Sequence, residues 1–151
     1  MTFEIHVCAS CGQGVVQLAG PVDVQALCDV LNALLDHEDW TPDTHAIWDV
    51  REVTDLYVTP AAEQRLTRLA ADLRVGSEAG RTALLARTTS QRAYGTVLLR
   101  TVRGETRNQQ TFQSAQRAIE WLGRRNNRAD TAPCSPSCPM HQLLSSTGSP
   151  S

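Results

Sequence analysis

Short apolar segments alternate with amphipathic helical segments along most of this chain, and this alternation constrains the fold more than any other feature. The strongest helical signal lies at 24–35, where apolar residues recur at i, i+3, i+4, i+7, i+10 and i+11. Apolar segments at 44–50 and 82–86 are short and bounded by polar residues, as is typical of buried strands. Because parallel neighbouring strands need a crossover between them, the alternation predicts a mainly parallel sheet flanked by helices.

The amino-terminal part of the chain indicates a β-hairpin. Two strand-like segments, 3–7 and 15–18, are joined by a glycine-containing loop. Gly20-Pro21 is expected to end the second strand, and Asp23 is expected to cap the first helix. The later expected elements are a helix from Thr59-Pro60 to about 75, a helix from about Ser90 to 104, a short strand at 109–112 and a final helix after Ser114. The predicted fold is therefore an α/β mixed sheet of about five strands with four helices, in the order ββαβαβαβα.

The chain of 151 residues is long enough for one domain and a tail. We expect a domain over 1–126 and a disordered Ser/Pro-rich tail over 127–151, where almost nothing apolar remains to offset the entropy of ordering. No stretch approaches the roughly 18 to 20 apolar residues of a membrane span, and the first residues lack the order of a signal peptide. A cytoplasmic location is expected.

Charge is distributed unevenly along the chain. All 14 basic residues are Arg; residues 1–80 hold 4 of them against 13 Asp and Glu, whereas residues 81–128 hold 10 against two Glu. The favoured interpretation is that the two halves attract each other within one fold or across a dimer. The alternative is a basic face in the second half that binds anionic lipid or nucleic acid.

Four segments of the chain resemble the SpoIIAA-like branch of the STAS superfamily of small bacterial proteins. They occur in the family's order and span most of residues 3–123. The segments are VVQLAGPVDVQA (15–26), HEDWTPDTHAIWDVR (37–51), GRTALLARTTSQRAYG (80–95) and FQSAQRAIEWL (112–122).

The resemblance implies a sheet flanked by helices, and we expect a noncatalytic binding or regulatory module. The superfamily includes phosphorylatable regulators and domains related in shape to CRAL-TRIO lipid carriers, so it implies no single activity. The regulators carry an Asp-Ser-Ser-Gly motif after the central strand, where this chain has Asp49-Val50-Arg51-Glu52. The chain also has no phosphate-cradling glycine loop, GxSxG elbow or HExxH pair. We therefore expect neither enzyme activity nor a cofactor.

Two polar segments, 49–59 and 87–94, follow the expected central strands. Ligands of open parallel sheets bind beyond the carboxyl ends of the strands, beside helix amino termini. The candidate ligand-binding residues, here called the strand-end rim, are Asp49, Arg51, Thr54, Asp55, Tyr57, Thr59, Arg87, Ser90, Arg92 and Tyr94. Arg side chains beside a helix start are suited to phosphate or carboxylate, so we expect the rim to recognise a protein partner or a small anionic ligand, with a homodimer possible. The alternative is a solvated rim with capping hydroxyls, Thr59 among them, and an ion pair between Asp49 and an Arg.

The cysteines suggest a second, different hypothesis. Cys8 and Cys11 have the spacing of half a zinc site, and Cys134, Cys138 and His141 could complete a tetrahedral set. The two groups lie far apart in sequence, and closing that loop costs entropy before any metal binds. Reduced, unreactive thiols are therefore the default expectation, and zinc binding is the alternative.

Overall fold

The computed structural model describes residues 1–8, 12–41, 44–57, 59–73, 81–103 and 109–123. It confirms the predicted order of five strands and four helices. The elements are β1 (Thr2–Cys8), β2 (Gln13–Asp23), α1 (Val24–Asp36), β3 (His45–Tyr57), α2 (Pro60–Leu73), β4 (Thr82–Leu85), α3 (Thr89–Arg103), β5 (Gln109–Phe112) and α4 (Ala115–Gly123). The expected tail at 127–151 lies outside the described residues.

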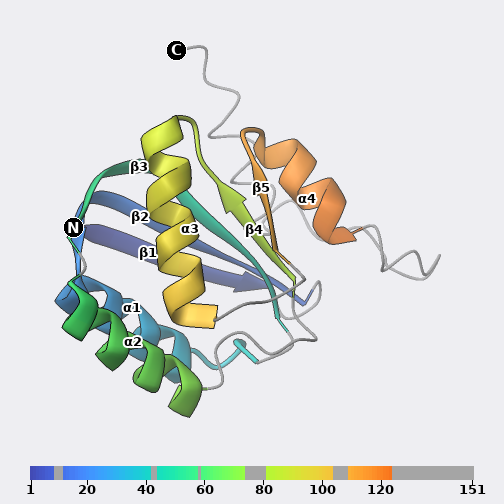
Figure 1. Cartoon of the computed structure of the whole chain (residues 1–151). Helices are drawn as coiled ribbons and strands as arrows, with labels where there is room; N and C mark the ends of the chain where they lie inside the picture. The colour runs from blue at the N-terminus through green and yellow to red at the C-terminus, as the bar shows by residue number, and fades with distance from the viewer. Residues whose placement is uncertain (9–11, 42–43, 58, 74–80, 104–108, 124–151) are drawn as a thin grey trace.

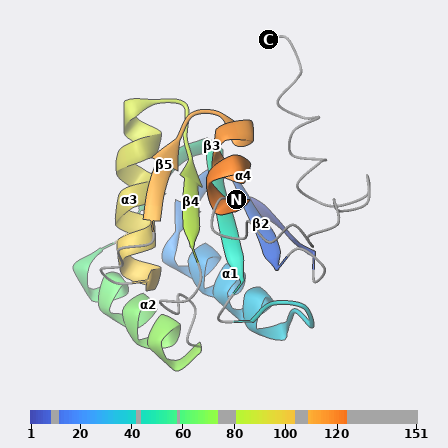
Figure 2. The same cartoon turned by 90° about the vertical axis from the view of Figure 1, so that its right-hand side faces the viewer.

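The strands form one sheet in the sequence order β1-β2-β3-β4-β5. β1 pairs with β2 antiparallel, and every later neighbouring pair is parallel. Crossovers between parallel strands are almost always right-handed, so strands laid down in one direction receive their helices on the same face. Figure 1 shows α3 crossing in front of the sheet, with α1 and α2 side by side below the strands. In Figure 2 the sheet stands between α3 and α4, because α4 follows the last strand and covers the other face. The predicted mixed α/β sheet is confirmed.

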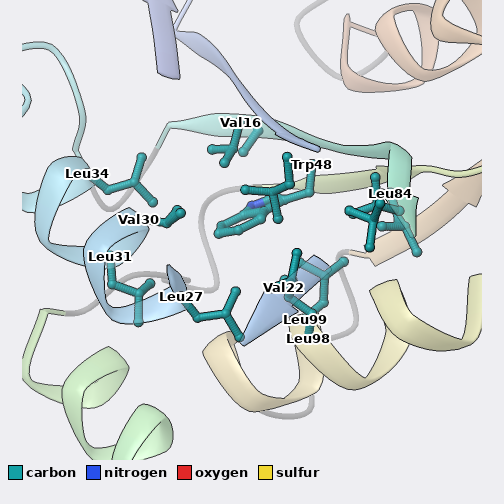
Figure 3. Close-up of a cluster of buried hydrophobic side chains, with 14 of the residues drawn as sticks. Val16, Val22, Leu27, Val30, Leu31, Leu34, Trp48, Leu84, Leu98 and Leu99 are labelled. Atoms are coloured by element: carbon teal, nitrogen blue, oxygen red, sulfur yellow. The ribbon is translucent and has the colours of Figure 1, made fainter. Parts of the chain in front are cut away.

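The larger part of the core lies between the sheet and the first three helices. Trp48 of β3 is 1% exposed and is surrounded by apolar side chains of β2, β4, α1 and α3 (Figure 3). On α1 the buried residues are Leu27, Val30, Leu31 and Leu34, close to the predicted stripe. Leu35 departs from the prediction: its side chain is 55% exposed, because the buried stripe is narrower than the apolar pattern.

A smaller core lies under α4. Ala115, Ala118 and Leu122 pack against the other face of β2, β3 and β4. Arg81, at the start of β4, holds the helix in place through a hydrogen bond of 2.7 Å from Nη1 to the Trp121 carbonyl. Its guanidinium carbon also lies 5.1 Å from the centre of the Trp121 ring. One Arg of the basic half therefore has a structural role.

The second strand does not end at Gly20-Pro21, where the sequence predicts that it ends. β2 continues to Asp23, with Gly20 at a φ of 85° and a shift of register between Gly20 and Pro21. A β-bulge allows Gly and Pro inside a strand, where a regular ladder of hydrogen bonds disfavours them. Asp23 then caps α1 as predicted, since its Oδ1 accepts a hydrogen bond of 2.8 Å from the Ala26 N–H.

Within the described part of the chain, no helix combines the length and the apolar character needed to cross a membrane.

Candidate functional site

β3 extends far beyond its neighbour β4, and this changes the shape of the predicted rim. The last pair between the two strands is Asp49 with Leu85, but β3 runs on beside β2 to Tyr57. The expectation that the strand ends at Val50 and a loop follows is therefore wrong. Two register shifts give β3 one extra residue each, between Asp49 and Glu52 and between Val53 and Asp55. Pairing with the long β2 keeps this polar segment in a strand where its own sequence indicates a loop.

Asp49 and Arg51 form a buried ion pair at the point where β4 ends. Arg51 donates from Nε to Asp49 Oδ1 at 2.9 Å and from Nη2 to Asp49 Oδ2 at 2.8 Å. The Arg51 backbone N–H adds a third bond, of 3.1 Å, to Oδ1. The two side chains are only 7% and 8% exposed, so each satisfies a charge that burial would otherwise leave uncompensated.

Gln91 joins this part of β3 to the start of α3, and it is absent from the predicted site. Its Nε2 donates to the Arg51 carbonyl at 2.6 Å and to the Val53 carbonyl at 3.3 Å. Its Oε1 accepts from the N–H groups of Arg87 and Thr88 at 2.9 and 3.3 Å. One buried amide therefore satisfies four backbone groups, two from the bulged strand and two from the loop before the helix.

A sequence signal for Gln91 exists. Thr88 and Gln91 form a capping box, in which the Thr88 hydroxyl accepts from the Gln91 N–H at 3.1 Å and the Gln91 side chain returns to the Thr88 N–H. The spacing Thr-x-x-Gln before an amphipathic segment is visible in the sequence. It also places the cap at Thr88, two residues before Ser90, near which the helix was expected to start.

The exposed members of the rim fall into two groups. Arg87, Ser90 and Arg92 are exposed at the start of α3, beside the Asp49–Arg51 pair and Gln91. Tyr57 and Thr59 are also exposed but lie at the end of β3, where Tyr57 pairs with Asp23. Gln91 at the start of α3 bonds to the Val53 carbonyl, and the four steps from Val53 to Tyr57 cover about 13 Å at the rise of a strand. Figure 1 accordingly places the start of α3 well away from the end of β3.

The remaining rim residues, Thr54, Asp55 and Tyr94, belong to neither group. Thr54 is exposed and Asp55 is half-buried along the extended part of β3, between the two groups. Tyr94 is half-buried and packs against the main core, as an apolar position of α3 does. Arg87 Nη1 lies 3.5 Å from Glu52 Oε1, with both side chains more than half exposed. This pair joins the basic half of the chain to the acidic half, as the favoured interpretation of the charge pattern expects.

The structure describes one of the five proposed zinc ligands, Cys8. Cys8 is half-buried and packs at the edge of the core under α4, and Cys28 packs against the main core. Cys11, Cys134, Cys138 and His141 lie outside the described residues. Over the described ranges, His, Cys, Asp and Glu side chains form no group of three or more that could hold a metal ion.

Comparisons with known proteins concern the fold. No model of a protein family matches the chain. No curated protein matches it either. The solved structure of the anti-sigma factor antagonist SpoIIAA in its unphosphorylated form is similar at 16% identity and a TM-score of 0.49, covering 79% of this chain and 96% of that one. An uncharacterized protein from the DUF3478 family, from Shewanella loihica, is similar at 20% identity and a TM-score of 0.49, covering 80% of this chain and 92% of that one. The first is described as SpoIIAA and the second as having a SpoIIAA-like fold.

Proposed function

We propose that this protein is a noncatalytic binding or regulatory module whose rim, at the start of α3, recognises an anionic group of a small ligand or a protein partner. The observation that carries the proposal is the grouping of Arg87, Ser90 and Arg92, all exposed, around one helix start. An amino-terminal helix turn and guanidinium groups both favour phosphate or carboxylate.

The two Arg side chains are available for a ligand in different degrees. Arg92 is exposed, and within the described ranges its guanidinium has no hydrogen bond or ion pair. Arg87 contacts Glu52 at 3.5 Å in an exposed pair, and such pairs contribute little and exchange readily. An incoming anion therefore displaces at most one weak contact.

The base of this site is rigid, which lowers the entropic cost of binding a ligand there. Gln91 fixes the helix start to β3 through its four hydrogen bonds, so the exposed side chains project from a fixed frame. Asp49 is the carboxylate that could serve as a general base here, but both of its oxygens accept hydrogen bonds from Arg51. A carboxylate held in a bidentate pair is a poor acceptor for a substrate proton.

A thermal-shift experiment with inorganic phosphate and with adenosine nucleotides tests the proposal, with sodium chloride at matched ionic strength as the reference. A ligand at ten times its Kd stabilises the folded state by about 1.4 kcal/mol, which raises the Tm of a domain of this size by roughly 4 °C. Arg92→Ala should abolish the shift. Arg100→Ala, an exposed Arg two turns further along α3, is the matched control and should retain it.

Two results would contradict the proposal. One is the absence of any shift beyond that of chloride with every anion tried. The other is an equal loss of the shift in the Arg92 and Arg100 variants, because that would indicate a general charge effect and not a site.

A further inference from the structure

The outer edge of β1 is a surface that the rim does not involve. β1 is the first strand in the sheet order, and in the described part of the chain it pairs only with β2 (Figure 1). An edge strand leaves every second N–H and C=O group without a ladder partner, and it can pair with a strand of another molecule. A strand that pairs with this edge must have a sequence complementary to that of β1.

The sequence of β1 is complementary to itself. β1 spans Thr2–Cys8, so an antiparallel pair of two copies that overlaps along its whole length is centred on Ile5. In this register Glu4 lies opposite His6 of the second copy, and Phe3 lies opposite Val7. The two faces also match, because directly opposed residues point to the same side of an antiparallel pair. A carboxylate opposite an imidazole that can donate a hydrogen bond to it, and apolar side chains opposite each other, each stabilise a sheet.

Neighbouring registers lack this match. A shift by one residue places the polar face of one strand beside the apolar face of the other. A shift by two residues brings Glu4 opposite Glu4, which opposes like charges, or His6 opposite His6, which leaves each Glu4 without an imidazole opposite it. The register that pairs all seven residues is thus also the register with the best chemistry.

The side chains concerned are accessible in one chain. Glu4 is 69% exposed and His6 is 40% exposed, and His6 Nε2 lies 3.3 Å from Glu4 Oε2. In the paired arrangement the four side chains lie two on each strand, and each carboxylate is directly opposite an imidazole of the other copy. Phe3 and Ile5 are half-buried against the main core, Val7 is half-buried on the same side of the strand, and pairing would cover part of their remaining surface.

We propose that the protein forms a two-fold symmetric homodimer through antiparallel pairing of its β1 strands, which joins two five-stranded sheets into one of ten strands. The occupant of this edge is a second copy of the same chain. An isologous interface of this kind closes on itself, so it predicts a dimer and not a filament.

Sedimentation equilibrium of the full chain over a wide concentration range tests the proposal. His6→Glu places Glu opposite Glu at both symmetry-related positions, and it should weaken the dimer about 10-fold or more. The double variant Glu4→Lys with His6→Lys places Lys opposite Lys and should weaken it similarly. A 1:1 mixture of the two variants should restore association as a heterodimer, because each opposed pair then joins opposite charges. Far-UV circular dichroism of each variant checks that it is folded.

Three results would overturn the inference. The first is a wild-type chain that stays monomeric at every concentration measured. The second is a dimer of unchanged strength in His6→Glu, which would place the contact elsewhere. The third is a failure of the folded variants to associate when mixed. None of these depends on anion binding, so the rim proposal can stand or fall separately.

Discussion

Replacing Gly95 with Ala should destabilise this protein, against what its position in a helix suggests. Gly95 lies inside α3, and Gly in a helix interior usually costs roughly 0.5–1 kcal/mol relative to Ala. Propensity alone therefore predicts that the substitution stabilises. However, an added Cβ would lie 2.5 Å from both Leu84 Cδ atoms and 3.0 Å from its Cγ. Leu84 is fully buried on β4, so it has no open space into which to move.

The size of the effect follows from these two opposing terms. Inserting a methyl group into a filled core costs typically about 1–3 kcal/mol. Subtracting a propensity gain of at most about 1 kcal/mol leaves a net loss of about 1 kcal/mol, with a range from about 0 to 2. Urea unfolding followed by circular dichroism measures a difference of this size. The matched control is Gly123→Ala at the end of α4, where an added Cβ has no atom within 4 Å and the change should be neutral or stabilising.

A double-mutant cycle identifies the cause. Leu84→Ala alone should cost about 2–5 kcal/mol, as truncation of a buried Leu does. In that background Gly95→Ala should cease to destabilise, because the atoms that it would meet are gone, so the two effects are non-additive. Stabilisation of the wild type by Gly95→Ala, or additive effects in the cycle, would refute the close approach of α3 to β4.

Three further substitutions test the interactions that support the rim, and urea unfolding measures each. Asp49→Ala leaves the buried Arg51 uncompensated and should lower the free energy of unfolding by about 3–5 kcal/mol; a loss below about 1 kcal/mol would mean that the pair is hydrated. Gln91→Ala removes the amide that four backbone groups share and should cost about 1–3 kcal/mol, whereas Gln110→Ala on the exposed side of β5 should change little. Asp23→Ala removes the cap of α1 and should cost about 1 kcal/mol; an unchanged stability would contradict the capping geometry.

The sequence predicted the element order well because the relevant signals are local. The period of the apolar residues in 24–35 identifies α1 regardless of its neighbours, and Asp23 caps it through an atom three residues away. The short apolar segment of β4 is likewise buried along its whole length, as its composition indicates. Each of these properties is set within a few residues.

The candidate site was predicted less completely, because its geometry depends on contacts between distant segments. The segment after Val50 is polar and indicates a loop, yet pairing with β2 holds it in a strand as far as Tyr57. That extension moves Tyr57 and Thr59 away from the start of α3, where the sequence placed one rim. The spacing of Thr88 and Gln91 indicates a capping box, but the sequence gives no sign that the Gln91 amide also bonds to the Arg51 carbonyl, forty residues away.

By itself, the sequence determined the layered α/β architecture, the positions of the helices and the residues that fill the core, since periodicity and capping act over short distances. Only the tertiary structure decided how far β3 extends, that the pair of Asp49 with Arg51 is buried, and that the Gln91 amide joins the start of α3 to β3. The physical reason is that strand pairing and burial are properties of two or more segments together. β2 and β3 do not fall within one short window of the sequence, and neither do Gln91 and Arg51.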